Sequence, residues 1–176
     1  MFIHDNGNFH VLSNTRCGHT SMRNYFGMDL EPRRPHAIRW LEWVDSKSRR
    51  VVVLRNPVDR WKSAEVFHSI EWWVKNGPPA VPGGRMDKEK WIWIHRSPFL
   101  INIPRHIDVE IIPFENLSDY IPMHKDTMIS NTSDVSRSDF EDNIIPSCLK
   151  EELVSYRYFR KNCKVVDPEE WKELTP

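Results

Sequence analysis

A short polar stretch near the start of the chain combines the residue types that bind phosphate or sulfate groups. It covers residues 14–21 and contains Arg16, Gly18, Thr20 and Ser21. The guanidinium carries a fixed charge and several donors, the hydroxyls add donors, and a glycine permits close approach to the backbone. This composition predicts an anion site.

The residues on either side predict a strand before this stretch and a helix after it. Residues 9–13 are mostly apolar, and Met22, Tyr25 and Phe26 recur at helical spacing up to Gly27. N–H groups at a helix N-terminus lack intrahelical partners and stabilise an anion. The alternative is an ordinary turn capped by a hydroxyl residue. The two glycines and the lysine of the Walker pattern are missing, which disfavours an ATP or GTP loop.

A second stretch, at residues 51–63, has the same layout. Its first four residues are continuously apolar, as expected of a strand covered on both faces, and Arg55 follows them directly. Asn56 can cap a helix whose first position suits Pro57. Arg55 and Ser63 can then hold a phosphate, whereas the alternative is a solvated basic helix start. One arc of this long helix is expected to hold Val58, Trp61, Ala64 and Trp72, with Arg60 and Ser63 on its flank.

The composition is that of one globular domain, residues 1–176. Lys plus Arg equals Asp plus Glu at 25 each, so the overall charge does not favour nucleic acid as a partner. No apolar run is long enough for a membrane span and the start of the chain is polar, so we expect a cytoplasmic protein without a membrane anchor.

The three cysteines have neither disulfide-framework nor zinc-ligand spacing, and they are Cys17, Cys148 and Cys163. Cys17 lies in the first polar stretch, where it is a candidate nucleophile or a bystander. His36 precedes a helix expected over residues 37–44, a position where histidine is usually a surface or cap residue. The inner face of that helix is expected to hold Ala37, Ile38, Leu41 and Val44.

The other segments complete an α/β pattern. Residues 2–13 predict a hairpin with an Asn-Gly turn, and residues 77–84 are too rich in Pro and Gly for regular structure. We expect a helix over 87–94, a strand over 106–114, a polar stretch over 126–137 and a last helix over 147–162. The stripe of that last helix is expected to hold Leu149, Leu153, Tyr156 and Phe159 or Arg160. The predicted fold is a three-layer α/β domain with a mostly parallel central sheet.

The two polar stretches resemble the cofactor site of the sulfotransferases that use 3'-phosphoadenosine 5'-phosphosulfate (PAPS), close to the carbohydrate sulfotransferase branch. That family's 5'-phosphosulfate loop is Lys-x-x-x-Thr-Ser, and residues 16–21 read Arg-Cys-Gly-His-Thr-Ser. Its 3'-phosphate motif, Arg-Asx-Pro-x-x-Arg-x-x-Ser, is matched in full by residues 55–63. Arg16 stands where lysine is usual, and Thr15 where proline is common.

Shorter matches extend the resemblance over about residues 9–166. Residues 95–99 partly match the family's His-aromatic-x-Pro-Gln segment, residues 114–117 match Phe-Glu-x-Leu, and residues 131–133 match Asn-x-Ser, with a solvated loop as the alternative. The resemblance implies a P-loop-like sulfotransferase fold, with a lid or acceptor-side insertion at about residues 77–105.

The resemblance also implies roles for individual residues. Arg16 and the N–H groups of residues 18–21 would stabilise the bridging and leaving oxygens, while Arg55 and Ser63 would hold the 3'-phosphate. The expected catalytic residues are Arg16 and His36, the latter as general base with His95, His68 and Glu115 as rivals. His95 and Arg96 are expected on the acceptor side. The full expected cofactor-binding set is Arg16, Cys17, Gly18, His19, Thr20, Ser21, Arg55, Arg60, Ser63, Asn131 and Ser133.

The implied activity is transfer of a sulfuryl group from PAPS to a hydroxyl acceptor, with a carbohydrate favoured and no metal required. The product of the donor would be 3'-phosphoadenosine 5'-phosphate (PAP). Two alternatives stay open: a P-loop kinase or nucleotide hydrolase, and a catalytically inactive nucleotide-binding module. The acceptor and the oligomeric state are not determined by the sequence.

Overall fold

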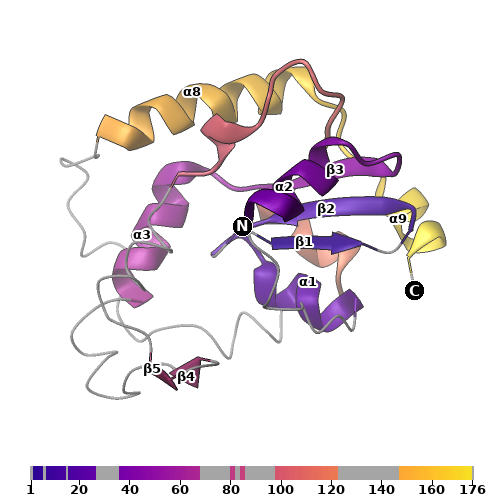
Figure 1. Ribbon diagram of the computed structural model, residues 1–176, viewed down its shortest axis with the longest axis horizontal. Helices are drawn as coiled ribbons and strands as arrows, with labels where there is room; N and C mark the ends of the chain where they lie inside the picture. Colours follow the sequence, from indigo (N-terminus) through magenta and orange to yellow (C-terminus); the bar gives the residue numbers. More distant parts are fainter. Residues whose placement is uncertain are drawn as a thin grey trace.

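The computed structural model describes residues 2–5, 7–14, 16–26, 36–67, 80–81, 84–85, 98–122 and 147–175. These residues form a mixed α/β structure in which helices flank a four-stranded, mostly parallel sheet (Figure 1). The sheet order is β1-β2-β3-β6, made by Phe2–Asp5, Phe9–Ser13, Arg49–Leu54 and Glu110–Pro113.

The first two strands form the predicted hairpin. β1 pairs antiparallel with β2, and Phe2 lies opposite Ser13. Gly7 in the turn has a φ of 86°, a left-handed conformation that glycine adopts without penalty. Because β2 then pairs parallel with β3, and β3 parallel with β6, the carboxyl ends of these three strands share one edge of the sheet.

The centre of the sheet is apolar, as its sequence predicts. All four residues from Val51 to Leu54 are buried, which is the pattern of a strand covered on both faces. β6 is shorter than the expected strand over 106–114, because residues 105–107 form a turn after Pro104 and Phe114 already begins a 3-10 helix. On the free edge of β6, Ile111 forms an isolated parallel bridge with Val165.

Helices α1, α2 and α3 fall in the stretches where the sequence predicts helices. α1 spans His19–Phe26, α2 spans His36–Val44 and α3 spans Pro57–Phe67. The Asn56 side chain accepts a hydrogen bond from Val58 N at 2.9 Å, which confirms the predicted cap. α8 spans Ser147–Asn162, confirming the last predicted helix, and lies beside α3 in Figure 1.

The predicted inner face of α2 is wrong at Leu41, while the side chains of Ala37 and Ile38 lie outside the described part and Val44 is half-buried. Leu41 is 58% exposed, whereas Trp43 is completely buried and its indole Nε1 donates to the carbonyl of His10 at 2.9 Å. The indole buries more apolar surface than a leucine and has a donor to satisfy, so the helix turns Trp43 toward the strand.

The short elements complete the described fold. The Pro-Gly segment is not wholly irregular as expected, since β4 (Ala80–Val81) pairs antiparallel with β5 (Gly84–Arg85). The 3-10 helices η1 and η2 span Leu100–Asn102 and Phe114–Asn116, and α6 spans Leu117–Tyr120.

A helix that the sequence analysis did not predict, α9, spans Pro168–Leu174 and packs on α6. Arg49 of β3 ties α9 to the sheet: it donates to Glu110 of β6 at 2.6 Å and to Glu170 of α9 at 2.5 Å.

Candidate functional site

The two polar stretches meet at the edge where the parallel strands end. Arg16 follows β2 and Arg55 follows β3, and the Arg55 guanidinium donates through Nη1 to the carbonyl oxygen of Arg16. Arg16 in turn donates to the Ser63 hydroxyl oxygen, through Nε at 3.0 Å and through Nη2 at 2.9 Å. Arg16 lies 39 positions before Arg55 and 47 positions before Ser63 in the chain. The three residues form one polar cluster, which we call the arginine cluster.

The backbone of the first stretch is a tight turn with an unusual conformation. Cys17 N donates to the Asn14 carbonyl at 2.9 Å, and Arg16 has a φ of 63°. Left-handed backbone is uncommon for residues other than glycine and persists only where the surroundings hold it in place. The bond from Arg55 to the Arg16 carbonyl is one such restraint.

Gly18 has a packing role that the sequence analysis did not foresee. Its φ is 73°, and a Cβ atom there would lie 2.3 Å from Cδ2 of Leu117. The side chain of Leu117, a core residue, therefore fills the space that a Cβ atom of residue 18 would need. Gly18 serves the close packing of the turn on α6, and the expected approach of a ligand is not needed to explain this residue.

The start of α1 follows directly. Met22 N donates to the Gly18 carbonyl at 2.9 Å, so His19, Thr20 and Ser21 form the first turn of the helix. N–H groups of a first turn have no acceptor within the helix and favour an anion. Thr20 is exposed, His19 is half-buried, and Ser21 is buried.

Cys17 is part of the turn, and its side chain is buried. It is a free thiol that is completely buried, and burial raises its pKa to about 11 against the opposing charges of Arg60 and Arg55. A buried, protonated thiol is a poor nucleophile at neutral pH. The arrangement therefore argues against Cys17 as the attacking group.

Arg55 and Ser63 are held in place by the surrounding fold. Arg55 is only 4% exposed, and its guanidinium carbon lies 4.3 Å from the centroid of the Phe114 ring, a cation–π contact. Ser63 is buried in α3. The prediction that Arg60 and Ser63 lie on the flank of α3 is wrong, since both are more buried than Val58 and Trp61.

Arg60 forms a buried ion pair with a carboxylate of α8. Its Nη2 donates to Oε2 of Glu152 at 2.9 Å, and the two side chains are 1% and 0% exposed. The sequence analysis missed Glu152. A signal was present, because Leu149, Glu152 and Phe159 share one face of α8 at helical spacing, and all three are buried. Of the predicted stripe, Leu153 and Tyr156 are half-buried, and the alternative Arg160 is exposed.

Several expected site residues, or their side chains, lie outside the described part of the structure. His36 is the first residue of α2, but its side chain lies outside the described part. His68, His95, Arg96, Asn131 and Ser133 also lie outside the described residues. Glu115 is described and exposed, in η2 next to the Phe114 ring that Arg55 covers.

No family model, curated protein or solved structure matches this chain.

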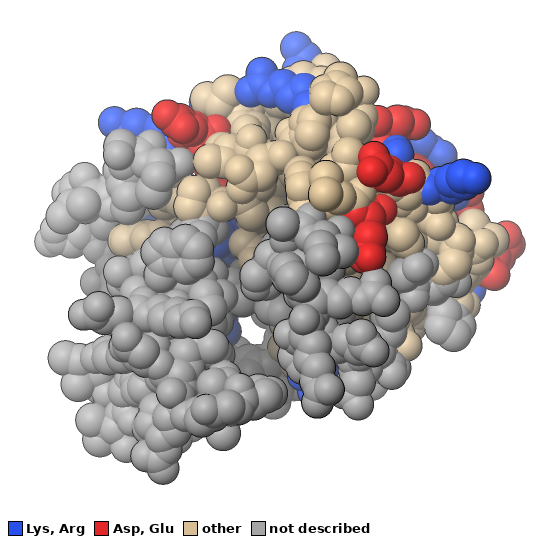
Figure 2. Space-filling model, in the orientation of Figure 1, with Lys and Arg blue, Asp and Glu red and all other residues tan. Residues whose placement is uncertain are grey.

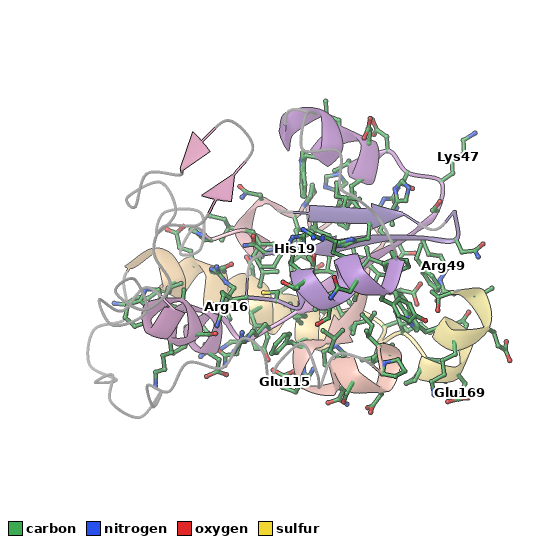
Figure 3. The ribbon with its side chains drawn as sticks, turned by 90° about the horizontal axis from the view of Figure 1, so that it is seen from below. Arg16, His19, Lys47, Arg49, Glu115 and Glu169 are labelled. Atoms are coloured by element: carbon green, nitrogen blue, oxygen red, sulfur yellow. The ribbon has the colours of Figure 1, made fainter. Side chains whose placement is uncertain are left out.

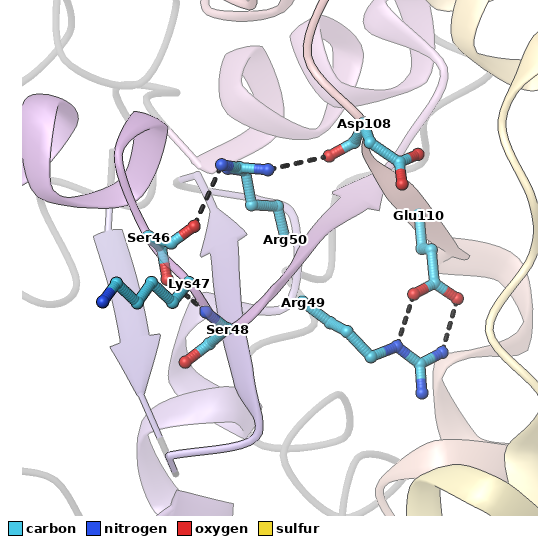
Figure 4. A pocket seen from close by; sticks show the side chains of 7 residues that line it. All are labelled: Ser46, Lys47, Ser48, Arg49, Arg50, Asp108 and Glu110. Atoms are coloured by element: carbon cyan, nitrogen blue, oxygen red, sulfur yellow. Dashed lines mark hydrogen bonds and ion pairs between the residues drawn. The ribbon is translucent and has the colours of Figure 1, made fainter.

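The arginine cluster is separate from the pocket at the other end of the sheet. Figure 3 shows Arg16 and His19 away from Lys47, Arg49 and Glu169. A pocket of about 190 Å³ lies by the amino ends of β3 and β6, and its lining residues are Ser46, Lys47, Ser48, Arg49, Arg50, Asp108 and Glu110 (Figure 4).

The two arginines of this pocket are already engaged. Arg49 binds Glu110 through two nitrogens at 2.6 Å. Arg50 donates to the carbonyls of Val44 at 3.0 Å, Ser46 at 2.9 Å and Asp108 at 3.4 Å. These bonds give both guanidiniums a structural role. We place the candidate site at the arginine cluster, because there the two polar stretches meet at the edge where the parallel strands end.

The described residues were also compared with the requirements of a membrane-spanning helix and of a metal site. Within the described residues, none of the helices is both long and apolar enough to cross a bilayer, and no group of three His, Cys, Asp or Glu side chains could hold a metal ion. On the face shown in Figure 2, acidic and basic side chains of the described residues lie interspersed.

Proposed function

We propose that this chain is a sulfotransferase that moves a sulfuryl group from PAPS to a hydroxyl acceptor, with a sugar hydroxyl favoured, on a three-layer P-loop-like fold. The observation that carries the proposal is the arginine cluster. The loop that resembles the 5'-phosphosulfate motif contacts the helix that resembles the 3'-phosphate motif through the two bonds from Arg16 to Ser63.

The chemistry of this set of donors fits a ligand with anionic groups on both sides of a ribose. Two guanidiniums, a serine hydroxyl and the first turn of α1 are all donors to anions, and guanidinium binds phosphate with good geometry. Arg55 and Ser63 would hold the 3'-phosphate of PAPS. Arg16 and the N–H groups that begin α1 would face the 5' side.

PAPS supplies an activated sulfuryl group whose departure leaves negative charge on a phosphate. Positive groups fixed before the reaction stabilise such charge without reorganising. Arg16 is suited to this role because the Arg55 bond and the Ser63 bonds hold both its backbone and its guanidinium. Like phosphoryl transfer, the reaction then needs an acceptor oxygen in line and a base for its proton.

His36 remains the proposed base, because imidazole accepts a proton near neutral pH. It opens α2, which leads through residues 45–48 into β3. Turnover in a His36→Ala variant that still binds PAP would move the role to Glu115, His95 or His68.

The deciding experiment is calorimetric titration with PAP, ADP and ATP, each with and without Mg²⁺. We expect tight binding of PAP alone, without metal. Preference for ATP with Mg²⁺ would overturn the proposal in favour of a kinase or hydrolase. Binding of PAP without transfer from PAPS to any of a panel of sugars, alcohols and peptides would favour an inactive binding module.

The Arg55→Ala variant tests the site itself. Loss of a charge-assisted hydrogen bond should weaken PAP binding by about 1.5 to 3 kcal/mol. Arg157→Ala is the matched control, since Arg157 is exposed on α8. Circular dichroism should show that both variants are folded, and unchanged affinity in Arg55→Ala would remove this residue from the site.

A further inference from the structure

A buried carboxylate on α8 connects the proposed 3'-phosphate helix to a distant part of the chain. Oε2 of Glu152 accepts from Arg60 of α3 at 2.9 Å, and Oε1 accepts from the backbone N–H of Phe99 at 2.9 Å and of Leu100 at 3.4 Å. Both oxygens are therefore used, and three segments of the chain converge on one side chain.

The Arg60–Glu152 ion pair contributes more to the orientation of α3 than to the stability of the fold. Both side chains are at most 1% exposed, and the cost of desolvating a buried pair can equal its attraction. Apolar side chains of similar volume would hold α3 against α8 about as well. A charged pair differs because its hydrogen bonds fix direction, and the Arg60 guanidinium also lies 5.8 Å from the centroid of the Phe99 ring.

The ion pair at Arg60 also affects the position of Ser63, which lies on the same helix. Arg60 and Ser63 are three residues apart, so they share a face of the helix, and both are buried. Fixing the rotation of α3 at Arg60 therefore fixes the position of the Ser63 hydroxyl. That hydroxyl is the oxygen that receives both bonds from Arg16.

We propose that Glu152 is a positioning residue for the donor site: by holding Arg60 it sets the rotation of α3, and so places Ser63 for the 3'-phosphate. This rests on the proposed function. It also reassigns Arg60, which the sequence analysis expected to bind the cofactor directly, to a supporting role behind the site.

The test compares PAP with adenosine 5'-phosphate, which lacks the 3'-phosphate, by calorimetry at a temperature where each variant is folded. In Glu152→Gln, which keeps the shape and loses the charge, we expect PAP affinity to fall about tenfold or more. Affinity for adenosine 5'-phosphate should stay within about twofold, because only the 3' side is misplaced. The matched control is Glu151→Gln, the exposed neighbour on α8, which should keep both affinities.

A double variant separates positioning from stability. Arg60→Met with Glu152→Gln removes both buried charges with little change in volume, and it leaves an amide oxygen at position 152 to accept from the backbone N–H groups of Phe99 and Leu100. We expect it to melt within a few degrees of the wild type while keeping the lowered preference for PAP. A wild-type preference for PAP in either folded variant would overturn the positioning role alone. Absence of any PAP preference in the wild-type chain would instead overturn the proposed function, and the positioning role with it.

Discussion

At the scale of single residues, two glycines with left-handed backbone have different reasons to be glycine. Gly7 has a φ of 86° with nothing within 4 Å of the position a Cβ would take, whereas at Gly18 that position is 2.3 Å from the Leu117 side chain. The conformation alone explains Gly7. Gly18 needs both the conformation and the missing side chain.

Alanine at each glycine should separate these two costs. Gly7→Ala should lower the free energy of unfolding by about 1 kcal/mol, the cost of left-handed backbone. Gly18→Ala should lower it by about 3 kcal/mol, because a clash with the core is added. Urea unfolding measures both, and equal losses would show that Leu117 moves aside without cost.

His4 is a buried histidine that the proposed mechanism does not use. Its Nε2 lies 3.1 Å from the Ser13 hydroxyl, and its ring stacks on Phe26 at 5.9 Å between centroids. Its Nδ1 is buried without a hydrogen-bond partner among the described residues. Burial lowers its pKa to about 4, so the ring is neutral in the folded protein at neutral pH.

Because the pKa of His4 is lowered in the folded state, the free energy of unfolding depends on pH. Below about pH 6.5 the unfolded chain binds a proton at this histidine and the folded chain does not, so stability falls as the pH drops toward 4. This group should contribute a loss of about 2 kcal/mol between pH 7 and pH 4.5. His4→Phe should lack that part of the loss, while the exposed His106→Phe control should retain it. Parallel pH profiles for wild type and His4→Phe would contradict the assignment.

At the scale of elements, α9 packs against the core near Phe9 of β2. Its cap is complete: Asp167 Oδ1 accepts from Glu169 N at 2.8 Å and from Glu170 N at 3.2 Å, and Pro168 takes the first position. The fully buried Trp171 packs at 5.0 Å from the Phe9 ring, and its indole donates to the Tyr120 carbonyl at 3.0 Å.

Truncating this tryptophan should therefore be costly. Trp171→Ala leaves a large cavity and an unpaired carbonyl, and should lower the free energy of unfolding by about 3 to 5 kcal/mol. Lys172→Ala is the control on the same helix, since Lys172 is exposed and should change stability by at most about 0.5 kcal/mol. Chemical denaturation checks both, and a small loss for Trp171→Ala would mean that α9 is only peripherally attached.

At the scale of the whole molecule, the proposed site depends on the parallel sheet. The carboxyl ends of β2 and β3 share one edge because the two strands are parallel, and this edge is where open α/β sheets bind ligands. A ligand held by both following segments ties them together, so binding should stabilise the folded chain.

Thermal unfolding should report that linkage. PAP at about 100 times its dissociation constant should add about 2.7 kcal/mol, or roughly 5 to 10 °C in melting temperature for a chain of this size. A chelator should leave the shift unchanged. A shift that appears only with Mg²⁺, or only with ATP, would contradict the proposed donor.

The sequence by itself determined the features that depend on neighbouring residues. The hairpin, the Asn56 cap, the buried run of β3 and the limits of α8 were all predictable, because turns, caps and periodicity act within a few positions. The missed α9 belongs in this group, since Asp167 and Pro168 are an ordinary helix start.

Only the tertiary structure decided which side chains meet across the chain. Arg60 and Glu152 are 92 positions apart, and Gly18 faces Leu117. Helical spacing can place Glu152 on a buried face, but no local pattern tells which residue either one meets. The same holds for α2, where Trp43 rather than Leu41 turns inward. Burial is a property of the assembled core. Local periodicity offers several faces to each helix, and packing against the sheet selects the one that buries most apolar surface and gives most buried polar groups a partner.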